Sequence, residues 1–263
     1  MQKYWQLFLL SWQNGLVYRT SLLMWRLRQF LSTVMALTVW SVLFNSSSSL
    51  FGYDRTQMTT YIFLVGILQS LILATGLNGL SNQVYSGSFS FDLLKPINIY
   101  VYLFVQDMAD KAKNVFFVVI ESIILFLLFK PSIFFPSIET AIIFCIWVLG
   151  AVLLLFFIQL IFGSFGFYSP ETWGPRFLFF MFVDFTAGKL FPLDILPPII
   201  RTFVGFTPFP YFSFWQIQLF LGKLSPMEIG QHTVVLSIWI AIAGYVSFSL
   251  WQKGIKDYSA AGQ

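Results

Sequence analysis

Charged residues are scarce in this sequence, and they are absent from stretches long enough to cross a membrane. Asp, Glu, Lys and Arg make up 10% of the 263 residues, whereas about 25% is usual in a soluble domain. None of the four occurs in residues 29–53, 56–91, 140–170, 202–222 or 229–252. A helix crosses the hydrocarbon core with about 20 mostly apolar residues. The sequence therefore predicts a multi-pass integral membrane protein and excludes a soluble one.

Cysteine and histidine occur once each, and their scarcity excludes several kinds of chemistry. The single cysteine, Cys145, allows no intrachain disulfide, and its apolar surroundings predict a small buried side chain. The single histidine, His232, has no cysteine or clustered carboxylate near it, so we expect a hydrogen-bonded interfacial side chain and no metal site. The sequence has no Gly-rich loop of the P-loop pattern and no hydrolase constellation. We therefore expect no catalytic residues and no cofactor bound by this chain.

Apolar and aromatic residues dominate what is present, at 57% and 20% of the sequence. Helices joined by short connections satisfy every backbone polar group internally, as a bilayer demands. We expect a single all-α membrane domain over residues 1–263, with an interfacial helix over 1–20 and six transmembrane helices. The predicted spans are about 23–44, 58–80, 99–129, 140–167, 176–190 and 231–251.

The third span carries charge in its first half, at Asp107, Asp110, Lys111 and Lys113. These residues favour a start in water or at the interface, with 114–129 as the apolar part.

The first twenty residues are too polar to cross a bilayer. On a helical wheel Trp5 and Trp12 lie on an apolar side, opposite Lys3 and Asn14. This pattern predicts a helix lying in the interface with its Trp side toward the hydrocarbon. An early extension of the first span is the alternative.

Residues 191–228 are apolar but contain six of the eleven prolines, which break helices and remove a backbone donor. We expect short re-entrant helices rather than a plain span, because irregular backbone is tolerated at membrane depth only when protein or water covers it. The residues that mark this segment are Pro192, Asp194, Pro197, Pro208 and Pro210.

The placement of Lys and Arg predicts the orientation, because cytoplasmic loops carry an excess of both. With the N-terminus inside, the inner segments hold ten of these residues and the outer segments five. The sequence therefore predicts that both termini and the loop between spans two and three are cytoplasmic. It places the proline-rich segment outside.

Polar residues inside predicted spans are candidate contacts for a transport path, because ionisable groups are expensive there. Glu121 is either a substrate contact or a structural hydrogen-bonding partner of another span. Asp184 and Lys189 are five residues apart, so we do not expect them on one helix face. Gln69 and Asn78 accompany small residues in the second span and either line a path or join two copies of the chain.

Residues 87–96, in the predicted cytoplasmic loop, combine a glycine hinge, an amphipathic half-turn and a proline stop. Such an exposed element is suited to a partner's groove, with its charges fixing the register. An ordinary interfacial turn is the alternative. The residues expected to contact a partner are Phe91, Asp92, Leu93, Leu94, Lys95 and Pro96.

This segment resembles the S-G-x-(L/F)-D-x-L-L-x-R/K-P loop of the six-span permeases of type-2 ATP-binding-cassette exporters. Residues 188–197, with 207–212 and 221–222, are similar to the outer loop of that family after its fifth span. Residues 251–258 with Gly262 resemble its tail, W-x-x-G-x-x-x-Y-x-x-x-G. Lys95 stands where Arg is commoner, which keeps the charge but loses the planar fork.

The resemblance implies a permease subunit in the cell membrane of a prokaryote that works as a dimer, with a second copy or a sister permease. Each permease would engage a separate cytoplasmic ATPase subunit that holds ATP and magnesium. Residues 91–96 would couple the two, and Trp5 and Trp12 would belong to a bracing interfacial helix. Membrane lipids are expected partners and nucleic acids are not.

The residues alone leave two other readings open. An ion-coupled secondary transporter or channel predicts transport by the purified protein without any nucleotide-binding partner. A membrane scaffold predicts no transport.

Overall fold

A computed structural model describes residues 2–17 and 19–258, which fold into a helical bundle with one short β-hairpin. In chain order the elements are α1 (Gln2–Val17), α2 (Arg19–Leu43), β1 (Ser49–Leu50), β2 (Tyr53–Asp54), α3 (Arg55–Leu68), the π-helix η1 (Gln69–Leu73), α4 (Leu80–Tyr85), α5 (Ser90–Leu93), α6 (Ile99–Phe129), α7 (Ile138–Ser164), η2 (Phe165–Phe167), α8 (Trp173–Thr186), η3 (Leu193–Ile195), α9 (Pro198–Gly205), η4 (Phe209–Phe212), α10 (Phe214–Phe220) and α11 (Pro226–Asp257).

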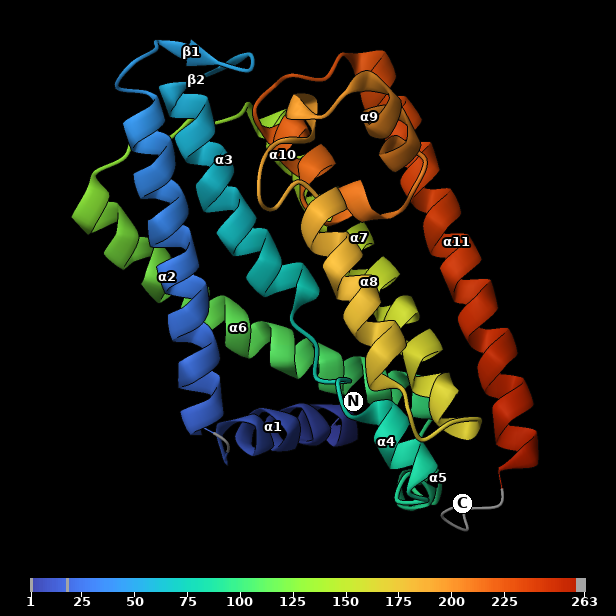
Figure 1. The fold of residues 1–263 in the computed structure, drawn as a ribbon. Coiled ribbons are helices and arrows are strands. Elements are labelled where there is room, and N and C mark those ends of the chain that lie inside the picture. The colour runs from blue at the N-terminus through green and yellow to red at the C-terminus, as the bar shows by residue number, and fades with distance from the viewer. Residues whose placement is uncertain (1, 18, 259–263) are drawn as a thin grey trace.

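The long helices run between two ends of the bundle (Figure 1). At one end, here called the base, α1 lies crosswise and α4 and α5 protrude; the start of α1 and the end of α11 are both there. The hairpin, α9 and α10 lie at the opposite end, here called the far end. Helix α6 crosses the bundle obliquely behind α2 and packs against α1. The fold therefore separates the N-terminal helix and α4–α5 from the proline-rich segment.

Four helices are long and apolar enough to cross a membrane: Arg55–Leu73, Ile99–Phe129, Ile138–Phe167 and Pro226–Lys256. They correspond to predicted spans two, three, four and six, so the multi-pass character of the chain is confirmed. Helix α2, with 25 residues, is about 37 Å long but more polar. Helix α8, with 14 residues, is about 21 Å long, less than the roughly 30 Å hydrocarbon core. A six-span topology thus needs α2 and α8 as well.

The second span ends well before the predicted residue 80. The helical segment stops at Leu73, and Ala74 is extended. The ammonium of Lys111 on α6 donates hydrogen bonds to the carbonyls of Ile72 (2.8 Å) and Ala74 (2.5 Å). These bonds satisfy carbonyls that a helix end leaves without partners. The span ends early because a lysine on another helix stabilises the break.

Helix α6 has the bounds predicted for the third span, and most of its charged residues are buried inside the protein. Asp107, Lys111 and Lys113 are all buried. Lys111 Nζ lies 3.5 Å from Asp107 Oδ2, and Thr75 Oγ1 donates to Asp107 Oδ1 at 2.6 Å. The charges tolerate burial because each has a partner on α6 or on the chain after η1.

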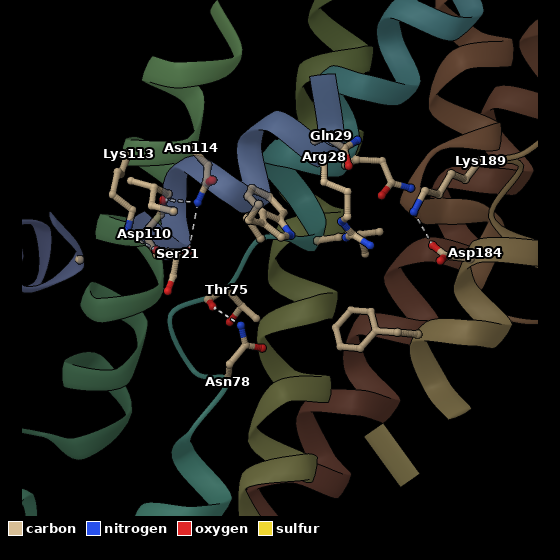
Figure 2. A pocket seen from close by; sticks show the side chains of 17 residues that line it. Ser21, Arg28, Gln29, Thr75, Asn78, Asp110, Lys113, Asn114, Asp184 and Lys189 are labelled. Carbon is tan, nitrogen blue, oxygen red and sulfur yellow. Dashed lines mark hydrogen bonds and ion pairs between the residues drawn. The ribbon is translucent and has the colours of Figure 1, made fainter. Parts of the chain in front are cut away.

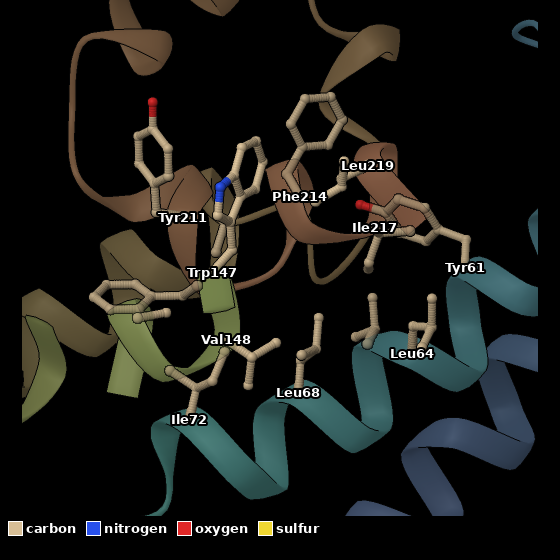
Figure 3. Close-up of a cluster of buried hydrophobic side chains, with 14 of the residues drawn as sticks. Tyr61, Leu64, Leu68, Ile72, Trp147, Val148, Tyr211, Phe214, Ile217 and Leu219 are labelled. Carbon is tan, nitrogen blue, oxygen red and sulfur yellow. The ribbon is translucent and has the colours of Figure 1, made fainter. Parts of the chain in front are cut away.

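The apolar core near the far end is formed by α3, η1, α7, η4 and α10 (Figure 3). Leu64, Leu68 and Ile72 point from the α3–η1 segment toward Ile217 and Leu219 of α10. Proline-rich sequence therefore contributes buried core residues, and α10 packs inside the bundle. The predicted burial of Cys145 is wrong, because its side chain is exposed on α7. Apolar neighbours in sequence do not distinguish the two cases. In a membrane, the outer surface of a helix is as apolar as the core.

The starts of α3 and α11 are set by capping boxes that extend both helices beyond the predicted spans. Ser225 Oγ accepts from the backbone N–H of Glu228 (3.4 Å), and Glu228 Oε2 accepts from the N–H of Ser225 (2.8 Å). Asp54 and Gln57 make the same exchange at α3. These reciprocal bonds satisfy donors that a helix start leaves free.

Replacing Ser225 with Ala should lower the free energy of unfolding by about 1 kcal/mol, because one cap acceptor is lost. Ser225→Asp keeps an acceptor and should stay near the wild-type value. Thermal unfolding in mild detergent measures both variants. Equal stability of the wild type and Ser225→Ala would contradict a role for this cap.

Candidate functional site

A compact protrusion at the base contains the sequence singled out at residues 87–96 and is called here the base knob. Gly87 has φ of +79°, a conformation that favours glycine, and Ser90 Oγ donates to its carbonyl at 2.7 Å. The chain then forms the single turn of α5. Phe89 is fully buried, with its ring 5.3 Å from that of Trp251 on α11. The knob is therefore anchored to the last helix by one aromatic side chain.

Two apolar side chains of the base knob face outward. Phe91 is 71% exposed and Leu94 is 81% exposed, whereas Leu93 is half-buried against the apolar cluster around Trp251. Pro96 is exposed at the end of the knob. The predicted contact residues are thus brought together, and Phe91 and Leu94 form their apolar outer surface.

The charged residues of the base knob are held by α6. Lys95 Nζ donates to Asp92 Oδ1 at 2.7 Å and to the hydroxyl of Tyr102 at 3.1 Å. Tyr102 donates to Asp92 Oδ1 (3.1 Å) and accepts from Gln106 Nε2 (2.8 Å). Burial acts to lower the pKa of Lys95, but the hydrogen bonds and charges of Asp92 and Tyr102 outweigh it and raise that pKa. The ammonium stays charged and fixes the knob to α6.

Helix α1 borders the base knob. Lys3 Nζ donates to the carbonyl of Pro96 at 3.4 Å, and Leu7 packs into the apolar cluster around Trp251. On another side of α1, Trp5, Phe8 and Trp12 form a stacked row with centroid distances of 5.4 and 6.3 Å. Trp5 is exposed and Trp12 is half-buried. The apolar residues of α1 thus lie on two sides of the helix. One side faces α6, and the other carries the row of Trp5, Phe8 and Trp12.

A cavity of about 650 Å³ lies among α2, η1, α6 and α8, and is called here the polar cavity (Figure 2). Four of the five polar residues singled out within the predicted spans line it: Gln69, Asn78, Asp184 and Lys189. Their grouping required the chain break after η1, which turns Asn78 toward the start of α8. Arg176 on α8 donates to the backbone carbonyl of Asn78 and to its Oδ1, the latter at 2.7 Å.

Two ion pairs stand at the polar cavity. Lys113 Nζ lies 2.5 Å from Asp110 Oδ1, and Lys189 Nζ lies 2.8 Å from Asp184 Oδ1. As expected, Asp184 and Lys189 do not share a helix face, yet the two side chains still form an ion pair. Helix α8 ends at Thr186, and Gly188, with φ of +79°, reverses the chain so that Lys189 returns to the helix.

Glu121, the fifth of these residues, lies outside the polar cavity. Its carboxylate accepts two hydrogen bonds from Arg26 on α2, at 2.7 and 2.5 Å. Arg26 also donates to Ser70 Oγ at 2.9 Å. Of the two readings left open, the structure supports the partner of another span, since Glu121 joins α6 to α2 and η1.

At the far end, Asp194 is the centre of a hydrogen-bond network. It accepts from the hydroxyl of Tyr53 (2.6 Å) and from Gln218 Nε2 (2.9 Å), and Arg201 Nη1 lies 3.7 Å away. The network ties the hairpin to η3 and α10. The predicted hydrogen bond of His232 is confirmed, since its Nδ1 lies 2.9 Å from the Tyr211 hydroxyl.

The prolines of this segment stand where short helices begin. Pro192, Pro197 and Pro208 precede η3, α9 and η4 respectively, and Pro210 is buried within η4. A fixed φ suits a helix start, where a missing N–H costs nothing. The prolines thus divide the segment into short helices, as their spacing suggested.

Sequence reasoning missed four residues that organise these sites: Arg28 and Asn114 at the polar cavity, Arg176 beside Asn78, and Lys111 behind η1. A charged residue next to an apolar run was the available signal for Lys111 and Arg176. Their roles depend on contacts with distant segments, which spacing along one helix does not reveal.

Comparison with known proteins adds one match. The model of a family described as "ABC-2 family transporter protein" matches residues 30–262, from within α2 to beyond α11. The match includes the base knob and the proline-rich segment. No curated protein sequence matches the chain.

Proposed function

This chain belongs to the ABC-2 family of transporter proteins, and from that membership we propose that it is the permease subunit of an ATP-driven exporter. It is a transport permease of the multi-pass membrane class. In the proposal, two permeases, identical or sister chains, pair in the cell membrane of a prokaryote. Each engages a cytoplasmic ATPase subunit that holds ATP and magnesium.

The observation that carries the proposal is the base knob. Exposed Phe91 and Leu94 stand on a turn that is fixed from behind by Phe89 and from the side by Tyr102. Binding interfaces are built around aromatic or aliphatic anchors that enter a partner's pocket. A rigidly held apolar pair beside an ion pair suits an ATPase groove.

Contacts behind the base knob offer a route for transmitting force. Asp92 and Lys95 bond to Tyr102 on α6, and Lys111 of the same helix bonds to the carbonyls at the end of η1. Gln69 of η1 lines the polar cavity. We propose that displacement of the knob by ATPase closure moves α6, and that α6 reshapes the cavity wall.

Other parts of the chain have supporting roles in this proposal. Helix α1 lies in the headgroup layer with Trp5 facing lipid, and braces the knob through Lys3. The segment from Pro192 to Pro210 lies at the outer surface, so that both termini and the knob are cytoplasmic. Helices α2 and α8 complete six spans.

The test replaces the exposed pair of the base knob. Phe91→Asp and Leu94→Asp should each weaken binding of the ATPase about thirtyfold or more, as loss of an interface hot spot of roughly 2 kcal/mol does. The permease is purified in mild detergent, and retained ATPase and its stimulated turnover are measured. Phe135→Asp is the matched control, because Phe135 is also exposed but lies in the loop between α6 and α7.

Undiminished co-purification and ATP-driven transport in Phe91→Asp and Leu94→Asp would contradict the proposed coupling site. Transport by the purified permease without nucleotide would instead favour an ion-coupled carrier or a channel. Loss of ATPase in Phe135→Asp as well would show that the effect is not specific to the knob.

A further inference from the structure

We propose that each copy of this chain binds an anionic amphiphile, with the charged head in the polar cavity and a hydrocarbon chain in the adjoining groove between α2 and α3. The inference names a class of cargo for the proposed permease and rests on that function. It starts from a second cavity of about 250 Å³, lined mostly by apolar residues of α2 and α3, with Gln29, Ser32 and Thr33 among them, and by residues 189–192; it is called here the apolar groove. Gln29 and Lys189 line both cavities, so the two adjoin each other.

Arg28 gives the polar cavity its charge preference. The other charged lining residues form two neutral pairs, Lys113 with Asp110 and Lys189 with Asp184. Within the described residues no ion pair is formed by Arg28, and Figure 2 shows its side chain extending into the cavity between these pairs. The exposed guanidinium carries one positive charge without a counterion among the described residues. A head with one negative charge, such as a phosphodiester, matches it.

Two buried amides supply neutral hydrogen-bonding groups to the same cavity. Gln69 is 7% exposed and Asn114 is 3% exposed, and both line the cavity. Gln69 Nε2 and Asn114 Oδ1 have no hydrogen-bond partner within the described residues. A buried polar atom without a partner is unfavourable by about 1–3 kcal/mol. The wall of the cavity therefore contains one donor and one acceptor without partners, both beneath the cavity surface, and a head with hydroxyl or ester oxygens would satisfy them once the two side chains turn toward it.

Gln69 lies where the regular α-helical geometry of α3 ends. It is the first residue of the π-helix η1, a form that is frequent at functional sites. The wider turn brings Gln69 to the cavity that Asn114 enters from α6. Two side chains with orphaned polar atoms, from different helices, thus line one cavity, which packing alone does not explain.

The apolar groove has the length and lining for a hydrocarbon chain. Along α2 it extends from Gln29 to Trp40, about 16 Å at the helical rise. Met35, Ala36 and Val39 line it from α2, with Ile62 and Val65 opposite on α3. On α2, the charged Arg28 lines the polar cavity on the base side, and beyond Ser32 and Thr33 the α2 lining of the groove is apolar. One molecule with a head and a chain fits this order.

The binding test uses the permease alone, in detergent micelles, with a phosphatidylglycerol labelled on its chain. Arg28→Gln should weaken binding about tenfold to a hundredfold, which corresponds to loss of one charge-assisted hydrogen bond. Arg28→Lys should retain most of the affinity. Arg19→Gln is the matched control, because Arg19 is an exposed arginine of α2 that lines neither cavity. Equal binding by the wild type and Arg28→Gln, or an equal loss in Arg19→Gln, would overturn the proposal.

A second arm separates the lipid from its free headgroup and tests the groove independently of Arg28. Glycerol 3-phosphate should compete at least a hundredfold more weakly than the lipid, because it has no chain. Val39→Trp fills the groove and should weaken lipid binding about tenfold or more, whereas Val42→Trp, on α2 outside the groove, should not. Equal competition by glycerol 3-phosphate, or unchanged binding in Val39→Trp, would overturn the amphiphile assignment.

The ligand and the ATPase are tested separately. Binding of phosphatidylcholine as tightly as phosphatidylglycerol would contradict the charge preference, whatever the ATPase result. Loss of ATPase coupling in the base-knob variants, with lipid binding retained, would leave this assignment standing. No ATPase is present in the binding assay, so a different measurement would contradict each of the two proposals.

Discussion

Replacing Lys111 with Met is expected to lower the free energy of unfolding by about 3–5 kcal/mol, the usual effect of removing one partner of a buried ion pair. Lys111 is 3% exposed and Asp107 is fully buried, with the ammonium 3.5 Å from the carboxylate. The variant leaves that carboxylate without its cation and the carbonyls of Ile72 and Ala74 without their donor. Thermal and denaturant unfolding in mild detergent measure the loss.

A second variant tests the physical reason. Adding Asp107→Asn to Lys111→Met removes the stranded charge and should recover part of the stability, because a neutral amide is easier to bury than a carboxylate. Lys253→Met serves as the control, since Lys253 is exposed on α11 and makes no ion pair within the described residues. A loss below 1 kcal/mol in Lys111→Met, or no recovery in the double variant, would contradict this account.

Replacing Arg26 with Met is expected to destabilise the chain by a similar amount, about 3–5 kcal/mol. The Arg26–Glu121 pair is bidentate, with contacts of 2.7 and 2.5 Å, and Ser70 accepts a further bond at 2.9 Å. Bidentate pairs of this kind are among the stronger hydrogen bonds in proteins. Glu121→Met should be similarly harmful, because it leaves the guanidinium of Arg26 buried without a counterion.

The double variant Arg26→Met with Glu121→Met distinguishes a pair from two independent residues. Its loss should be smaller than the sum of the single losses, since both charges are then absent. Additive losses in denaturant titrations would contradict a coupled pair. Arg28→Gln, two residues away on α2, should change stability by less than about 0.5 kcal/mol, because Arg28 is exposed and unpaired within the described residues. Variants of Arg26 thus test folding stability, and variants of Arg28 test ligand binding.

The sequence was informative about helices wherever a long run lacked charge. The predicted span 99–129 has the bounds of α6, and the starts of α2 and α11 lie four and five residues before the predicted ones. Capping boxes account for some of the remaining difference, because Ser225 and Asp54 start helices in polar sequence. Local composition therefore predicted which segments are helical. It predicted the first residue of each helix less well.

Contacts between distant segments were beyond the reach of sequence patterns. Lys111 ends the second span from another helix, and Gly188 returns Lys189 to Asp184 after the helix has stopped. The base knob was recognisable as a motif, but which of its side chains are exposed depends on Trp251 of α11. Pairings of this kind are set by tertiary packing, which periodicity along one helix does not encode.

The exposed thiol of Cys145 on α7 makes the natural chain uniquely addressable. One maleimide or nitroxide group would attach per molecule, with no background to remove by mutagenesis. In an assembly of two identical chains, the labels would form a single pair related by symmetry, and one spin–spin distance would describe the spacing of the α7 helices. An assembly with a different sister chain would give no such distance unless that chain carried a thiol of its own.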